Sequence, residues 1–216
     1  MKTRKNVDIV AHGATPEHIL RRLQQKGYTV SRQYAAATGA ACLSHPDFTL
    51  DLSGPTPAQA RQQAQTGAYI DLAGHWHPAG QHLGYVLYAG GSDAAITLAR
   101  PLLDALAPVS SAWLMTGPAG SATFMRQYMD ALGYSLHYGQ AAHDMQFTPA
   151  DLLQRLQGQE QLLERIRQLA QRYLASHPAP APATSNLPPD HRQPHFAQAL
   201  AQWLLRLSDT FPSGPN

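Results

Sequence analysis

Residues 7–31, with the sequence Val-Asp-Ile-Val-Ala-His-Gly-Ala-Thr-Pro-Glu-His-Ile-Leu-Arg-Arg-Leu-Gln-Gln-Lys-Gly-Tyr-Thr-Val-Ser, decide the fold. A short apolar run over 7–11 predicts a buried strand. Thr15 suits the N-cap of a following helix, and Gly27 suits its end. The residues after Gly27 predict a second strand. A strand, a helix and a strand in this order form a βαβ unit, in which the two strands run parallel.

The same alternation of strands and helices continues along the chain. Further strands are predicted at 48–53, 68–72, 85–89 and 112–115, and further helices at 58–65 and 94–106. Residues 35–47 are small and weakly patterned, so no helix or strand is predicted there, and residues 74–82 are predicted to be a His-rich loop. The pattern predicts an α/β fold with a Rossmann-like, mostly parallel sheet and helices on both faces.

Beyond residue 117 the strands give way to helices. Helices are predicted at 121–138, 149–175 and 193–207, which together form an all-α C-terminal extension. The predicted segments are a shortened Rossmann-like domain at 1–117, long helices at 118–176, a proline-rich linker at 177–192, and an amphipathic helix with its tail at 193–216.

Charge and cysteine content narrow the functional classes. The 16 Lys and Arg against 14 Asp and Glu give a net charge of +2, which is too small to favour nucleic acid or an acidic membrane as a partner. No apolar run approaches the roughly 18 residues that a membrane-spanning helix needs. The single cysteine, Cys42, fits a reducing compartment, so we expect a cytoplasmic protein.

Three segments carry a resemblance to a known family. They are Tyr-Val-Leu-Tyr-Ala-Gly-Gly-Ser-Asp-Ala-Ala at 85–95, Ala-Arg-Pro-Leu-Leu-Asp-Ala-Leu at 99–106 and Gly-Pro-Ala-Gly-Ser at 117–121. In residue type and spacing they resemble the 6-phosphogluconate and β-hydroxyacid dehydrogenases, a superfamily that includes 3-hydroxyisobutyrate dehydrogenase. The resemblance implies a truncated, divergent relative of NAD(P)-dependent oxidoreductases, with an NAD(P)-binding type of domain at 1–117.

The dinucleotide fingerprint of this family is only partly kept. Its Gly-x-Gly-x-x-Gly turn is matched by Ala11, Gly13 and Pro16, so one of three glycines remains and Pro16 lacks an N–H group. A phosphate site and an ordinary strand-to-helix turn both stay open. The cofactor-binding residues that the resemblance implies are His12, Gly13, Ala14, Thr15, Arg32 and Ser53.

Two further features bear on the cofactor. Arg32 follows the second strand, where it would suit a 2′-phosphate and so favour NADP over NAD. Only 16 residues separate Tyr34 from Asp51, where family members have several tens. One side of the cofactor cleft is then open or filled differently. We therefore expect that no dinucleotide binds, and NADP or NAD binding stays the alternative.

The catalytic motif of the family has changed as well. Its helix reads Lys-x-x-x-Asn, with the Lys as acid/base, and the matching residues here are Arg126 and Asp130. Arginine stays protonated and does not exchange protons near neutral pH. The pair therefore forms either an i,i+4 ion pair or a site for an anion.

The family's substrate-binding Ser-Gly-Gly is matched by the loop after Asp71. The substrate residues that the resemblance implies are His75, Trp76, His77 and Gly120, and we expect His75 or Trp76 to fill the substrate cleft. His75, His77 and His82 share this loop and are weak candidates for a zinc, copper or nickel site. We assign no metal.

Three hypotheses about function follow. We favour a non-catalytic relative that binds an anionic small molecule or a partner protein. The alternatives are an active NAD(P)-dependent oxidoreductase with altered acid/base residues, and a metal-dependent activity at the loop histidines. Family members bury the helices after the catalytic helix in a dimer. The helices at 149–175 and 193–207 are apolar on one face, so we expect a homodimer, with 118–176 of the dimerisation type.

Overall fold

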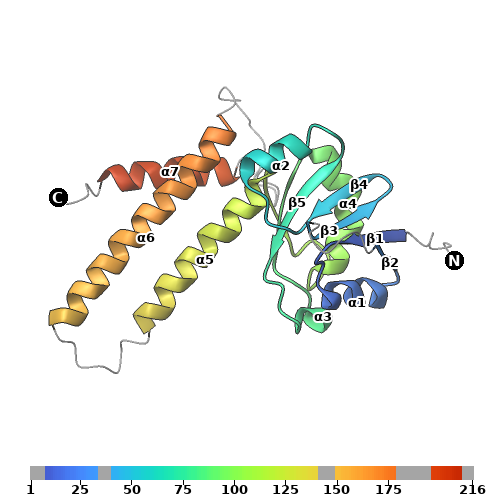
Figure 1. The fold of residues 1–216 in the computed structure, drawn as a ribbon, viewed down its shortest axis with the longest axis horizontal. Coiled ribbons are helices and arrows are strands. Elements are labelled where there is room, and N and C mark those ends of the chain that lie inside the picture. The colour runs from blue at the N-terminus through green and yellow to red at the C-terminus, as the bar shows by residue number, and fades with distance from the viewer. Residues whose placement is uncertain (1–7, 34–39, 141–148, 179–195, 211–216) are drawn as a thin grey trace.

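The computed structural model describes residues 8–33, 40–140, 149–178 and 196–210. A sheet covered by helices holds the N-terminal part of the chain, and three long helices extend away from it (Figure 1). The predicted linker at 177–192 lies almost entirely outside the described residues, and the division into four segments stays a prediction. No helix in the described ranges is long and apolar enough to cross a membrane.

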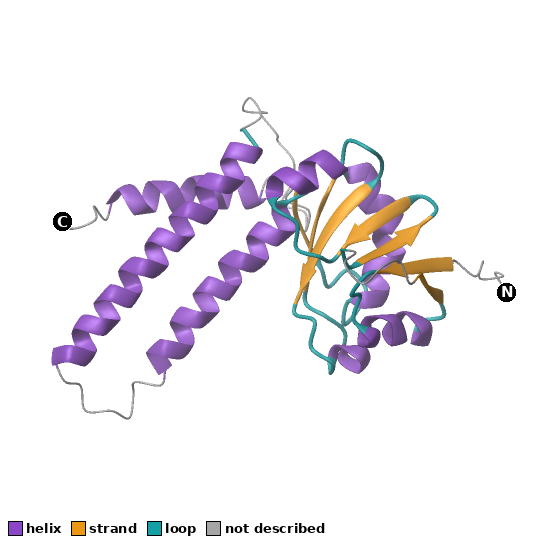
Figure 2. Cartoon of the chain, in the orientation of Figure 1, coloured by secondary structure: helices purple, strands orange, loops and turns teal. Residues whose placement is uncertain are grey.

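The strands of the described residues form one seven-stranded sheet in the order β2-β1-β3-β4-β5-β6-β7. Figure 2 shows this sheet in orange, with helices in purple around it. Their bounds are β1 (Asp8–His12), β2 (Thr29–Gln33), β3 (Cys42–His45), β4 (Phe48–Asp51), β5 (Tyr69–Gly74), β6 (Leu87–Gly91) and β7 (Leu114–Gly117). The pairs β1–β2, β4–β5 and β6–β7 are parallel. Strand β3 is antiparallel to both of its neighbours, and β5–β6 is antiparallel. The α/β, Rossmann-like fold class is confirmed, as a mixed sheet.

Helices cover both faces of the sheet. On one face lie α1 (Glu17–Gln25), α3 (Gly80–Leu83) and α4 (Asp93–Leu106), and on the other lie α2 (Pro57–Gln63) and α5 (Ser121–Gln140). Helices α6 (Pro149–Ser176) and α7 (Phe196–Thr210) pack on α5 and on each other. The all-α extension predicted beyond residue 117 is therefore present.

Successive side chains of β5 point to opposite faces of the sheet and belong to two different hydrophobic clusters. Ile70 and Leu72 belong to the hydrophobic cluster shared with α1 and α4. Ala73 belongs to the second cluster, which contains residues of α5, α6 and α7. Asp71 lies on the same side of the strand as Ala73, because side chains alternate across a sheet, and it is fully buried.

Within 35–47, where the sequence pattern predicted no strand, Cys42–His45 forms β3. This segment contains a single large apolar residue, Leu43, so its sequence pattern is weak. Pairing on both sides makes it a strand, with Leu43 opposite Ala11 of β1 and Leu50 of β4. In the shortened region after Tyr34, β3 therefore fills the position beside β1. The loop predicted at 74–82 also contains the short helix α3.

Arg22 joins three helices of one face. Its side chain is 2% exposed, and its guanidinium donates to backbone carbonyls at the C-terminal ends of α3 and α4. The Nε atom donates to Ala105 O at 2.9 Å, one terminal nitrogen donates to Ala107 O, and the other lies 3.3 Å from His82 O. A buried arginine is tolerated here because these carbonyls satisfy its donors and offer it the negative ends of two helices.

Candidate functional site

The turn between β1 and α1 keeps part of the geometry of a phosphate-binding turn. Gly13 has φ +59°, the left-handed conformation that favours glycine. Ala11 is fully buried, so its methyl group is accommodated in the sheet. Pro16 is extended and occupies the N-cap of α1, without a capping side chain. The turn therefore leads into an uncapped helix N-terminus, which is favourable for an anion.

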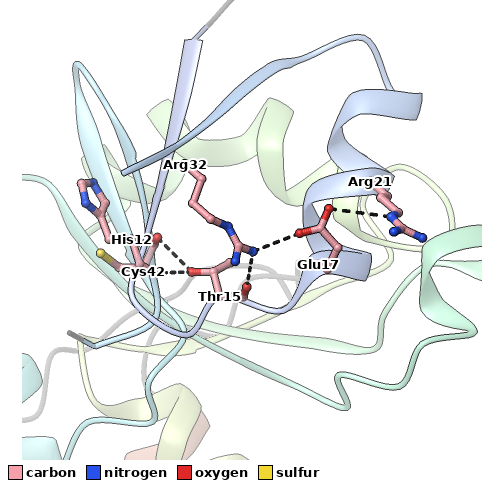
Figure 3. Close-up of polar contacts among 6 residues, drawn as sticks. All are labelled: His12, Thr15, Glu17, Arg21, Arg32 and Cys42. Carbon is pink, nitrogen blue, oxygen red and sulfur yellow. Dashed lines mark hydrogen bonds and ion pairs between the residues drawn. The ribbon is translucent and has the colours of Figure 1, made fainter. Parts of the chain in front are cut away.

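Thr15 is not the helix cap that the sequence predicted. Its buried hydroxyl donates to the His12 carbonyl at 2.6 Å and lies 3.3 Å from the Cys42 carbonyl (Figure 3). The hydroxyl therefore ties the turn to the start of β3. His12 and Gly13 are half-buried, and Ala14 is exposed.

Arg32 reaches from β2 to the same turn. One guanidinium nitrogen donates to the Thr15 carbonyl at 2.9 Å and pairs with the Glu17 carboxylate at 3.1 Å (Figure 3). Glu17 is also 3.7 Å from Arg21. The mouth of the turn thus carries two cations and one carboxylate, and Arg32 is held by a partner that an anionic ligand would have to share or displace.

Ser53 has its hydroxyl turned to its own loop. Both its amide and its hydroxyl donate to Asp51 Oδ1, at 2.8 and 2.6 Å. Asp51 Oδ2 accepts a hydrogen bond from the Tyr69 hydroxyl at 2.7 Å. The structure therefore places Ser53 at the end of β4, engaged with Asp51.

The N-terminus of α5 is capped from within the protein. Asp71 is fully buried, and its two carboxylate oxygens accept from the amides of Gly120 at 2.7 Å and Thr123 at 3.1 Å. Desolvation raises the pKa of Asp71 to about 7, and the backbone hydrogen bonds oppose that rise only in part. The strand that passes this carboxylate leaves no room for a side chain, since a β-carbon on Gly90 would lie 2.2 Å from Asp71 Oδ1. Gly120, a predicted substrate residue, thus belongs to this buried cap.

A stack of aromatic rings closes over the same helix start. The ring of Phe124 stacks on Tyr173, and Tyr173 stacks on His177, each with centroids 4.6 Å apart. His177 Nε2 lies 2.7 Å from the Ala119 carbonyl, and burial lowers the pKa of this imidazole. The end of α6 is therefore locked onto the beginning of α5. Sequence reasoning missed His177 because its partner lies 58 positions earlier.

Arg126 and Asp130 form the i,i+4 ion pair that was one of the two interpretations. Arg126 Nε lies 3.5 Å from Asp130 Oδ2, and the two side chains are 39% and 46% exposed. Binding of an anion by Arg126 stays a prediction.

The histidine loop lies away from α5. Trp76 packs edge-on against Tyr85 at 5.3 Å, with the core cluster of α1 and α4. Trp76 was expected to fill the substrate cleft. In the structure it packs instead on the face of the sheet that α1 and α4 cover. His75, His77 and His82 are exposed, and His77 Nδ1 accepts from the Ala79 amide at 3.2 Å. In the part of the chain that the structure describes, no three His, Cys, Asp or Glu residues are placed to hold a metal ion.

Comparison of this fold with solved structures identifies related architectures. An imine reductase from Myxococcus stipitatus, a variant in complex with NAD+, matches with a TM-score of 0.51 and 16% identity over 95% of this chain and 87% of its own. The chain has the fold of that imine reductase. A 3-hydroxyisobutyrate dehydrogenase from Mycobacterium tuberculosis, solved with L-serine, matches with a TM-score of 0.45 and 11% identity over 95% of this chain and 94% of its own.

The Rossmann-like α/β fold that the sequence predicted is therefore confirmed, because the chain shares its fold with the imine reductase. No family model and no curated protein matches the sequence.

The residues present fit an anionic group better than a whole dinucleotide. Gly13, the uncapped start of α1 and Arg32 are suited to a phosphate. Against a dinucleotide stand Pro16, which offers no N–H group, and Glu17, whose carboxylate already holds Arg32. The short antiparallel strand β3 also lies directly beside β1. No hydride-transfer step is derived from this geometry.

Proposed function

We propose that this chain is a non-catalytic relative of the NAD(P)-dependent β-hydroxyacid dehydrogenases and binds a small anionic molecule at the β1–α1 turn. The observation that carries the proposal is the pairing of Arg126 with Asp130 at the family's acid/base position. A guanidinium that stays protonated, paired to a carboxylate one helical turn away, cannot serve as the proton donor and acceptor of hydride transfer.

The anion site is supported by the charges at the turn. Arg21 and Arg32 outnumber the one carboxylate of Glu17, and the first amides of α1 add the positive end of a helix dipole. A phosphate monoester is doubly charged, and its oxygens accept hydrogen bonds from a planar guanidinium. NADP, with its 2′-phosphate, is the dinucleotide that this arrangement would favour over NAD.

Titration tests the proposal directly. NADPH, NADH, adenosine 2′-phosphate and adenosine are titrated into the full chain, followed by nucleotide fluorescence or calorimetry. We expect the 2′-phosphate compounds to bind more tightly than their unphosphorylated partners. Absence of saturable binding for all four compounds would overturn the proposed anion site.

An active oxidoreductase is the second candidate, favoured by the fold shared with an imine reductase in complex with NAD+. Turnover separates the two candidates, because a binding protein leaves NADPH absorbance at 340 nm unchanged with 3-hydroxy acids, imines and their oxidation products. Substrate-dependent NADPH consumption that Arg126→Ala abolishes would establish the enzyme instead.

A homodimer in the cytoplasm is also part of the proposal. Met129, Leu163 and Trp203 of the three extension helices are 40%, 40% and 54% exposed, and apolar residues of this size are usually covered by a partner when they share a face. Light scattering behind size exclusion measures the mass in solution. A concentration-independent monomer would contradict the dimer.

A further inference from the structure

A recess of about 470 Å³ lies on the sheet, and one of its lining residues, Cys42, touches the β1–α1 turn through Thr15. It runs along β3, β4 and the start of β5, between the β3–β4 hairpin and the loop after α2. Its volume is within the range of small-molecule sites, which is about 300–1,000 Å³. Its polar lining includes Cys42, His45, Asp47, Thr49, Asp51 and Tyr69.

The recess has a polar floor because of the strand register. Cys42 pairs with Asp51 and Ser44 pairs with Thr49, and these four half-buried side chains share one face of the β3–β4 hairpin. Leu43 and Leu50 are paired on the opposite face, in the core. Helix α2 lies on this face of the sheet and packs on β5 and α5. A surface that helices bury is normally apolar, so this polar face is suited to a solvated ligand.

The charge of the recess is negative. Asp47 and Asp51 line it, and Asp71 stands beside Asp51 in the β4–β5 register. Its described lining contains no Lys or Arg, and the imidazole of His45 is 3.6 Å from Asp47. An anionic ligand would therefore be repelled, and a cationic ligand attracted, with little competition from the protein's own cations.

Asp51, which lines the recess, has hydrogen-bonding capacity to spare. Its Oδ1 accepts two hydrogen bonds, from the amide and hydroxyl of Ser53, whereas Oδ2 accepts one, from Tyr69. A carboxylate oxygen accepts about two hydrogen bonds, so one position on Oδ2 stays available. Burial and the neighbouring Asp51 raise the pKa of Tyr69, so this hydroxyl remains a donor and holds Oδ2 in place.

We propose that this recess binds a small organic cation, a primary amine for example, with Asp51 as its counter-ion. The amine would donate to Asp51 Oδ2, and its carbon skeleton would lie over Thr49 and Cys42. This site differs in sign of charge from the anion site at the β1–α1 turn, and its failure would leave that proposal untouched.

Cys42 is the only cysteine of the chain and lines the recess, so its thiol reports the local charge. Two methanethiosulfonate reagents are compared, one with a trimethylammonium group and one with a sulfonate group. We expect the ratio of their rates at Cys42 to exceed the ratio for free cysteine by about threefold to tenfold, as one or two carboxylates within several ångströms predict. A ratio equal to that of free cysteine would overturn the proposal.

Protection of the thiol then tests binding. Benzylamine, benzyl alcohol and benzoate are compared as competitors of iodoacetamide at Cys42, with Asp51→Asn and Asp47→Asn as site variants. Asp93→Asn, which removes an exposed carboxylate of α4, is the matched control. We expect protection by benzylamine alone, lost in Asp51→Asn and kept in Asp93→Asn. Equal protection by all three compounds, or none by benzylamine, would refute the cation site. Asp47→Asn, at an exposed position, decides the charge dependence if Asp51→Asn unfolds.

Discussion

The two helices that begin at the family's functional turns are anchored in opposite ways. At α5 the first amides are satisfied by the buried carboxylate of Asp71. At α1 the first turn has no side-chain cap, and the nearest charges are the partly exposed Arg32 and Glu17. The start of α1 is open to an anion, whereas at α5 the buried carboxyl group of Asp71 already accepts the first hydrogen bonds. This difference supports the proposal that ligand binding belongs at α1.

Removing the buried carboxyl group of Asp71 is expected to have the largest effect on stability. Asp71→Ala leaves the amides of Gly120 and Thr123 buried without an acceptor and opens a cavity beside Gly90. We expect a loss of about 3–5 kcal/mol in the free energy of unfolding, measured by urea denaturation. Glu17→Ala at the other helix start should cost less than about 1 kcal/mol. Equal losses in the two variants would mean that the two helix starts are not anchored differently.

The buried anchor of α1 gives the next largest effect. Helix α1 is held by Arg22, whose guanidinium binds the carbonyls of Ala105 and Ala107. Arg22→Met keeps the length of the side chain and removes its donors, and we expect about 2–4 kcal/mol of destabilisation in urea. Arg21→Met, one position earlier and exposed, is the matched control and should be nearly neutral. A small effect at Arg22 would show that α1 is held by its apolar face alone.

Asp71 also makes stability depend on pH. Its pKa is about 7 in the folded chain against an ordinary value of 3.8, so the folded state holds this proton more tightly. The stabilising contribution of the protonated group is fully present below about pH 4 and is lost as the pH rises through about 7. Melting temperatures across this range should fall with rising pH more steeply in the wild type than in Asp71→Asn.

Direct titration provides an independent check on the same carboxyl group. NMR of the side-chain carbon of Asp71 should show a midpoint near neutrality. A midpoint near 4 would mean that the hydrogen bonds from the α5 amides outweigh desolvation, which is the opposite balance from the one inferred.

At the open helix start, the expected effects are on binding and not on stability. Arg32→Gln removes a guanidinium that now holds Thr15 and Glu17, and we expect the affinity for adenosine 2′-phosphate to fall by about fivefold to twentyfold. Glu17→Gln frees Arg32 and should raise that affinity by about twofold to fivefold. Calorimetry measures both, with adenosine as the uncharged reference. Changes of the same sign in the two variants would exclude the model in which Glu17 competes with the ligand.

The sequence allowed the local elements of both regions to be predicted but not what anchors them. The sequence predicted the βαβ unit because Ile19, Leu20 and Leu23 repeat at helical spacing between two short apolar runs, and all three are buried. Strand β3 could not be predicted from the sequence, because Cys42–His45 is a strand only through pairing with β1 and β4.

Anchoring residues were missed for a related reason. Asp71 and Gly120 are 49 positions apart, and Arg22 and Ala105 are 83 apart. Neither partner carries a pattern that reveals the other. In the sequence, the polar residues of α1 are typical of a solvent-exposed helix face. In the structure, one of them, Arg22, is buried against the ends of α3 and α4. Asp71 stood out in the sequence only as part of a family motif.

The smallest effect is expected at the exposed surface of α5, where the ion pair replaces the family's acid/base pair. Arg126→Lys with Asp130→Asn restores the family residues at these two positions. Because both side chains are more than one-third exposed, the double variant should change the free energy of unfolding by less than about 0.5 kcal/mol. It should also gain no NADPH-dependent turnover, because the β1–α1 turn keeps Pro16 and Glu17. Turnover in the double variant, absent from the wild type, would show that only these two residues separate this chain from a dehydrogenase. The contrast between the buried cap of α5 and the open start of α1 would then say nothing about function.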